Sequence, residues 1–93
     1  MEYLEYDKEM KDTVKEILEL DNQVYKNMNN HSQFTMDFFE EVAYNIEEDK
    51  FNAGSTLYKL ENILEVFDPV KKDDIEVLEQ LKEKLERLNK VVL

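Results

Sequence analysis

The stretch NAGSTLYKL, residues 52–60, contains the only glycine of the chain and is the one segment whose residue types suggest phosphate binding. A Walker-type loop needs several glycines after a strand, followed at once by Lys and Ser or Thr. Here Gly54 is alone, Lys59 follows too late, and no strand pattern precedes it. We therefore interpret residues 53–55 as small residues near a helix start that let another helix approach closely. Gly54 costs this helix about 1 kcal/mol of propensity.

Carboxylates gather in residues 32–49, which contain six acidic residues and no basic one. A di-iron bundle would need Glu-x-x-His motifs on separate helices. The only histidine, His31, instead has Met28 and Phe34 three residues away on either side. The segment from Asp68 lacks the alternating oxygen ligands and central glycine of a calcium loop. We therefore predict no metal site and no cofactor.

Nucleophilic catalysis has equally little support in the sequence. The chain has no cysteine, which excludes a thiol nucleophile, a disulfide framework and a thiolate zinc site. No serine is paired with an obvious base, and a lone histidine in an Asn-rich turn, His31, is expected to be a capping or solvated residue. The sequence predicts that the protein is not an enzyme.

The charge is strongly acidic and unevenly distributed. Twelve basic and 23 acidic residues give a net charge of −11, and the whole excess lies in residues 1–68. This balance argues against direct nucleic-acid binding, because Lys and Arg supply the affinity for phosphates. No apolar run approaches the ~20 residues of a membrane span, and the acidic start does not fit a secretory signal. We expect a soluble cytoplasmic protein, and the abundance of Lys, Asn, Ile and Glu is typical of a low-GC bacterium or its phage.

Apolar residues recur at steps of three and four along the chain, which predicts amphipathic helices. The first helix covers about 25 residues, and Asp21 occupies a position where an apolar residue would continue its seam. The Asn-rich residues 27–33 form a connection. Asn30 with Gln33 fits a capping box, so the second helix is expected to begin near His31.

The last helix, from about residue 73 to 92, has the most regular pattern. Its leucine seam follows near-heptad steps, but about two and a half heptads are too few for an autonomous coiled coil. Asp73 with Glu76 fits a capping box, and Glu83 with Arg87 fits a favourable ion pair one turn apart. We expect this helix to hold the bundle together or to pair with a second copy.

A third helix is expected from about residue 50 to 67, where Asp68-Pro69 ends it, because proline lacks the N–H and disfavours helix at the preceding residue. One Gly and one Pro leave too few turns for a sandwich or barrel. The predicted fold is all-α: a small antiparallel up-and-down bundle of about four helices, or three long helices and a shorter one. Residues 1–93 are expected to form one domain.

Residues 43–69 resemble a single tetratricopeptide repeat. Tyr44 and Ala53 are nine residues apart, an acidic turn separates two helical segments, and Pro69 closes the stretch. The chain departs from the motif because the glycine of the first helix is missing and the second half is about one helical turn too long. A single copy cannot form a solenoid, so the resemblance implies a helical hairpin and no function.

The first helix carries an acidic stripe of six carboxylates at steps of three and four. The stripe consists of Glu2, Glu5, Glu9, Asp12, Glu16 and Glu19. One interpretation is a solvated flank partly paired with Lys8, Lys11 and Lys15. The other is a surface that meets a basic partner, where complementary charge speeds association and rejects wrong partners, with Tyr3 and Tyr6 as anchors.

From these features we predict a non-catalytic module that binds a basic partner protein and inhibits, neutralises or chaperones it. Immunity, anti-defence, secretion-chaperone and adaptor proteins work in this way. The predicted partner-binding residues are Tyr3, Glu5, Tyr6, Glu9, Asp12, Glu16, Glu40, Glu41, Glu47 and Glu48. One alternative is a nucleic-acid mimic that occupies the DNA- or RNA-binding groove of a partner. Another is a structural homodimer or larger oligomer formed through the C-terminal helix, with a seam of Leu78, Leu81, Leu85, Leu88 and Val92.

Overall fold

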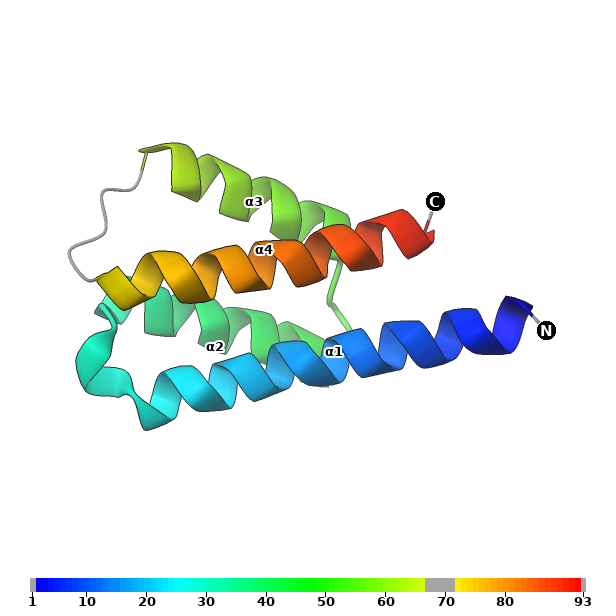
Figure 1. Ribbon diagram of the computed structural model, residues 1–93, viewed down its shortest axis with the longest axis horizontal. Helices are drawn as coiled ribbons and strands as arrows, with labels where there is room; N and C mark the ends of the chain where they lie inside the picture. Colours follow the sequence, from blue (N-terminus) through cyan, green and yellow to red (C-terminus); the bar gives the residue numbers. More distant parts are fainter. Residues whose placement is uncertain (1, 67–71, 93) are drawn as a thin grey trace.

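The structure is a computed structural model, which describes the backbone of residues 2–66 and 72–92 and the side chains of residues 8–66 and 73–89. The described helices are α1 (Glu2–Lys26), α2 (Gln33–Glu47), α3 (Ala53–Val66) and α4 (Lys72–Val92), with a short 3-10 turn, η1 (Met28–Asn30), between α1 and α2. Successive helices run in opposite directions (Figure 1). The predicted antiparallel up-and-down bundle is therefore confirmed.

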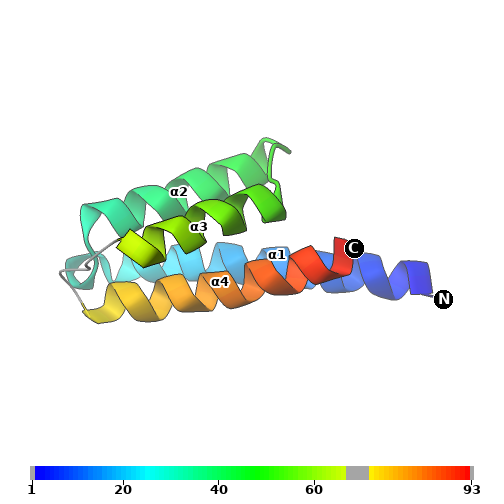
Figure 2. The same ribbon diagram turned by 90° about the horizontal axis from the view of Figure 1, so that it is seen from above.

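The four helices form two layers. Figure 2 shows α1 and α4 in one layer and α2 and α3 in the other. The closest packing is between α1 and α2, α1 and α4, and α3 and α4. The tetratricopeptide resemblance implied a helical hairpin, and α2 and α3 are indeed consecutive antiparallel helices. However, α2 packs mainly on α1, and α3 packs mainly on α4. The first turns of α1 extend beyond the ends of the other helices (Figure 1).

The leucine seam of α4 fills the centre of the bundle. Leu78, Leu81 and Leu85 have no exposed surface, and Leu88 is 2% exposed. They pack in one cluster with apolar residues of the other three helices, among them Phe39. Burying a side chain of this size contributes about 1.5–3 kcal/mol. This corrects the predicted dimer seam, because these four leucines are used inside one chain and leave no surface for a second copy.

The remaining residue of that predicted seam, Val92, has a side chain outside the described residues. The predicted stop at Asp68-Pro69 also lies outside them. The last described residue of α3 is Val66, and α4 is described from Lys72 onward, so Asp73 lies within its first turn and not at a cap position.

Side-chain caps place the starts of α2 and α3 later than expected. Ser32, not Asn30, caps α2: its hydroxyl oxygen accepts a hydrogen bond from the backbone N–H of Thr35. The predicted Asn30 capping box is therefore wrong, because Asn30 belongs to η1. At α3, the side-chain oxygen of Asn52 accepts from the backbone N–H of Ser55 at 2.9 Å. Capping of this kind contributes about 1 kcal/mol per helix.

Gly54, in the first turn of α3, lies at the contact with α4. A Cβ atom at this position would lie 3.3 Å from the side-chain oxygen of Asn89, which is tighter than an ordinary contact. The glycine therefore lets α3 approach α4 closely, as the small-residue interpretation expects.

Candidate partner-binding face

One member of the acidic stripe of α1, Glu16, contacts α4. Glu16 lies 3.1 Å from the guanidinium of Arg87 and 3.8 Å from the ammonium of Lys84. Arg87 therefore pairs with α1 and not, as predicted, with Glu83 of its own helix. The carboxylate of Glu16 thus joins two helices of the same chain, while its predicted role in partner binding stays a prediction.

Other members of the stripe have a different setting. Glu9 and Asp12 are exposed, so they stay available to a partner. The side chains of Tyr3, Glu5 and Tyr6 lie outside the described residues, and their predicted roles stay predictions.

The acidic residues of α2 lie near two different helices, α3 and α1. Glu41 points toward α3, where its carboxylate lies 3.9 Å from the ammonium of Lys59 in an exposed ion pair. Glu48 follows the last turn of α2 and is exposed. Glu40 and Glu47 are seven residues apart, so they share one side of α2. Both are close enough to Asp21 of α1 to raise the pKa of its carboxyl group.

Asp21 is the most unusual carboxylate of this surface. Burial is the main cause that raises its pKa above the ordinary value, and the negative charges of Glu40 and Glu47 raise it further. Its Oδ1 atom is buried without a hydrogen-bond partner. An unsatisfied buried acceptor costs about 1–3 kcal/mol. The break in the apolar pattern of the first helix was the sequence signal for this residue, but nothing in the sequence placed Glu40 and Glu47 next to it.

Two tyrosines border these carboxylates. The hydroxyl of Tyr25 donates a hydrogen bond to Glu40, and this bond is the main cause that raises the pKa of the phenol. Tyr44 is 54% exposed and lies one turn from both Glu40 and Glu47 on α2. Tyrosine is enriched among the residues that dominate binding energy at interfaces. Sequence reasoning chose Tyr3 and Tyr6 as anchors, and spacing alone could not show which tyrosines adjoin the carboxylates of two helices.

We call Asp21, Tyr25, Glu40, Tyr44 and Glu47 the acidic α1–α2 face. None of the ion pairs among the described side chains involves its three carboxylates. The described residues also contain no group of three or more His, Asp or Glu side chains placed to hold a metal ion. Chemically, the face offers several hydrogen-bond acceptors and uncompensated negative charge to a Lys or Arg side chain.

A buried histidine–aspartate pair links the connection between α1 and α2 to the first turn of α4. His31 is 7% exposed, and its Nδ1 atom lies 3.0 Å from Oδ1 of Asp74, which has no exposed surface. His31 is the C-cap residue of η1, where its backbone N–H donates to the carbonyl of Met28, so the capping expectation holds, but its side chain is buried and not solvated. Its partner is 43 residues away, and no local pattern distinguishes Asp74 from the adjacent Asp73.

Hydrogen bonds keep Asp74 ionised despite its burial. Burial by itself raises the pKa of a carboxyl group, but hydrogen bonds from Ser32, His31 and Thr35 outweigh it and lower the pKa of Asp74. The backbone N–H of Ser32 lies 3.1 and 3.3 Å from the two carboxylate oxygens. A carboxylate only accepts, so His31 Nδ1 carries the proton that it shares. A carboxylate orients general-base histidines in the same way, but the Ser32 hydroxyl in this network bonds to Thr35.

Comparison with protein-family models, with curated proteins and with solved structures gave no match. Among the described helices, none is both long enough and apolar enough to cross a membrane.

Proposed function

We propose that the protein is a non-catalytic binding module that engages the basic surface of another protein through the acidic α1–α2 face. The observation that carries the proposal is the buried, unpartnered oxygen of Asp21 beside Glu40 and Glu47. A free chain gains nothing from this arrangement, because the carboxylates repel one another and one of them is partly desolvated. Groups kept at a cost in stability are typical of functional sites.

A basic partner would remove that cost. A Lys or Arg side chain placed between α1 and α2 would compensate the repulsion and donate to the free acceptor of Asp21, and charge-assisted hydrogen bonds are the stronger class. The net charge of −11 would speed encounter with a basic surface. Tyr25 and Tyr44 would supply the aromatic contact area. Inhibition, neutralisation or chaperoning of the partner, in the cytoplasm, belongs to the same proposal.

The test uses neutral amides, which keep side-chain size. The tagged protein and the triple variant Asp21→Asn, Glu40→Gln and Glu47→Gln are used to capture proteins from a lysate of the source cells. The matched control carries Glu61→Gln, Glu79→Gln and Glu83→Gln, three exposed residues elsewhere on the bundle, and changes the net charge by the same amount. A partner that depends on the face is held by the wild type and the control, and binds the triple variant at least tenfold more weakly.

Equal capture by all three proteins would refute the role of the face. Competition with duplex DNA tests the alternative of a nucleic-acid mimic. Added DNA should displace a mimic from its partner, but should not displace a protein that binds elsewhere on that partner. Sedimentation of the protein alone tests self-association, and a monomer at high concentration rules out the structural oligomer.

A further inference from the structure

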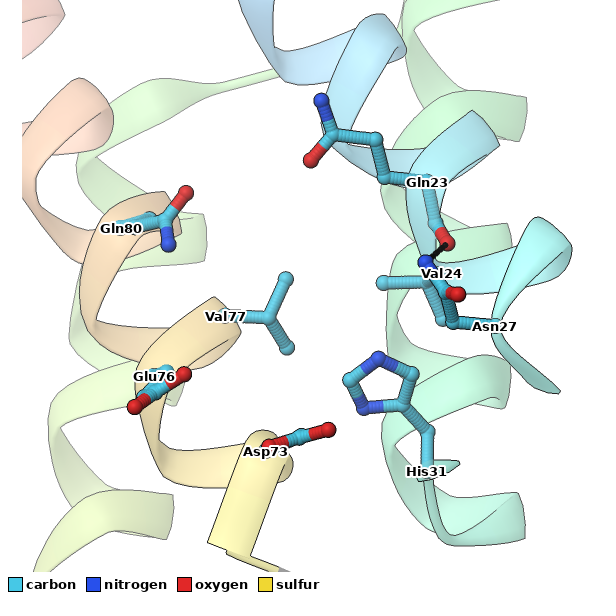
Figure 3. Close-up of a pocket in the computed structure, with 8 residues that line it drawn as sticks. All are labelled: Gln23, Val24, Asn27, His31, Asp73, Glu76, Val77 and Gln80. Atoms are coloured by element: carbon cyan, nitrogen blue, oxygen red, sulfur yellow. Dashed lines mark hydrogen bonds between the residues drawn. The ribbon is translucent and has the colours of Figure 1, made fainter. Parts of the chain in front are cut away.

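A cavity of about 150 Å³ opens between the C-terminal end of α1 and the first turns of α4. Figure 3 shows that the polar side chains around it come from both helices and that the ring of His31 lies at one end. The polar lining residues are Gln23, Asn27, His31, Asp73, Glu76 and Gln80. Val24 and Val77 complete the lining. The cavity lies on the α4 side of α1, away from the acidic α1–α2 face.

The lining of this cavity is rich in acceptors. Asp73 and Glu76 contribute carboxylates, and the side-chain amides of Gln23 and Gln80 each contribute an oxygen. No Lys or Arg is among the described residues that line it. The ionised carboxylate of Asp74 lies directly behind the His31 ring, at 3.0 Å from its Nδ1 atom, and adds to the negative potential.

Further along the contact between α1 and α4, an acidic side chain has basic partners. Glu16 of α1 contacts Lys84 and Arg87 of α4 there. Gln23 lies seven residues, about two turns, after Glu16, and Gln80 lies seven residues before Arg87, so both share the side of the helix that forms the ion pairs. Among the described residues that line the cavity, these acceptors have no Lys or Arg side chain beside them.

We infer that this cavity binds a guanidinium or primary ammonium group supplied from outside the chain. Its volume of about 150 Å³ leaves room for the head of an Arg or Lys side chain. It is well below the ~300 Å³ and more of ordinary cofactor pockets. The His31–Asp74 pair is buried and hydrogen-bonded, so it fixes one end of the cavity before any ligand enters.

The single histidine of the chain makes the test direct. The protein is titrated with ethylguanidinium and with butylammonium at constant ionic strength, while NMR follows the His31 ring and the side-chain amides of Gln23 and Gln80. Tetramethylammonium, a cation without N–H donors, is the control ligand. We expect saturable shifts with the first two cations only. A capped Gly-Arg-Gly peptide tests whether a protein side chain enters as well as a free small cation.

The carboxylates provide the matched variants. Asp73→Asn and Glu76→Gln should each raise the Kd for ethylguanidinium about tenfold, which corresponds to the loss of one charge-assisted hydrogen bond. Glu79→Gln, an exposed residue of the same helix outside the cavity, should leave the Kd unchanged. Shifts that do not saturate, equal shifts with tetramethylammonium, or an equal effect of Glu79→Gln would overturn the inference. The inference is independent of the proposed function, since Asp21→Asn should not change this Kd.

Discussion

Replacing Asp74 by Asn should destabilise the bundle strongly, although it changes one atom. Both carboxylate oxygens of Asp74 are in use: Oδ1 accepts from His31 at 3.0 Å and from the N–H of Ser32 at 3.1 Å, and Oδ2 lies 3.3 Å from the same N–H. An amide has one oxygen, so its NH₂ group must face a donor or leave one unpaired. The side chain has no exposed surface, so water cannot take over the lost bond.

The magnitude follows from two effects. The loss of a hydrogen bond to a charged acceptor costs about 1.5–3 kcal/mol, and a buried donor left unsatisfied costs about 1–3 kcal/mol, with partial overlap between them. We expect a total of about 2–4 kcal/mol. A chain of this length has a free energy of unfolding of roughly 5–14 kcal/mol. The melting temperature should therefore fall by about 10–20 °C.

Urea unfolding followed by circular dichroism measures this loss, with Asp73→Asn as the control. Asp73 carries the same charge on the same helical turn, but it is only partly buried. Its replacement removes a favourable charge near the helix N-terminus, worth about 0.3–1 kcal/mol. If Asp74→Asn costs less than about 1 kcal/mol more than Asp73→Asn, the buried network does not have the role that its geometry indicates.

The pH dependence gives an independent check. The folded-state pKa of Asp74 is lowered, so its contribution to stability is present above the unfolded value of about 3.9 and is lost as the pH falls through the folded pKa. The stability difference between wild type and Asp74→Asn should therefore stay constant from neutral pH to about pH 5 and shrink below about pH 4. A difference that grows on acidification would contradict the assignment.

Asp21→Asn should have the opposite sign and raise the free energy of unfolding by about 1 kcal/mol at pH 7, since it removes a partly desolvated charge beside Glu40 and Glu47. Because the folded pKa of Asp21 is raised, this gain should vanish once the pH falls to about 3, below the unfolded pKa of about 3.9. Destabilisation at neutral pH in urea unfolding would be the contrary result. Gly54→Ala gains about 1 kcal/mol of helix propensity but places a methyl group 3.3 Å from the Asn89 side chain. In a double-mutant cycle the gain should appear in full only with Asn89→Ala, and additive effects would show that the contact has no influence.

The helices follow from the sequence because their information is local. Steps of three and four between apolar residues give α4 its buried seam through Leu78, Leu81 and Leu85, and the same rule finds the other helices. Helix starts were less predictable, since Ser32 and Asn30 are both good caps and lie two residues apart. Only the path of the connection between α1 and α2 decides which of them caps the helix.

The candidate sites depend on pairs that lie far apart in the chain. Asp21 was recognisable as a break in an apolar pattern, but its pKa depends on Glu40 and Glu47 across the α1–α2 contact. His31 had no local signal, because its partner Asp74 is 43 residues away. A regular stripe on α1 looked like a binding surface, while one of its members pairs with Arg87 of the same chain.

The sequence by itself therefore determined the helical class of this protein, the residues of its core and the excess of acid in its first two-thirds. The helical period fixes which side chains share a face of one helix. Only the tertiary structure decided which faces meet, because that depends on how four amphipathic helices pack around one core. That packing pairs Glu16 of the α1 stripe with two bases of α4 and buries Asp74 fully but Asp73 only in part. It also brings the carboxylates of α1 and α2 together without a counter-charge among the described side chains.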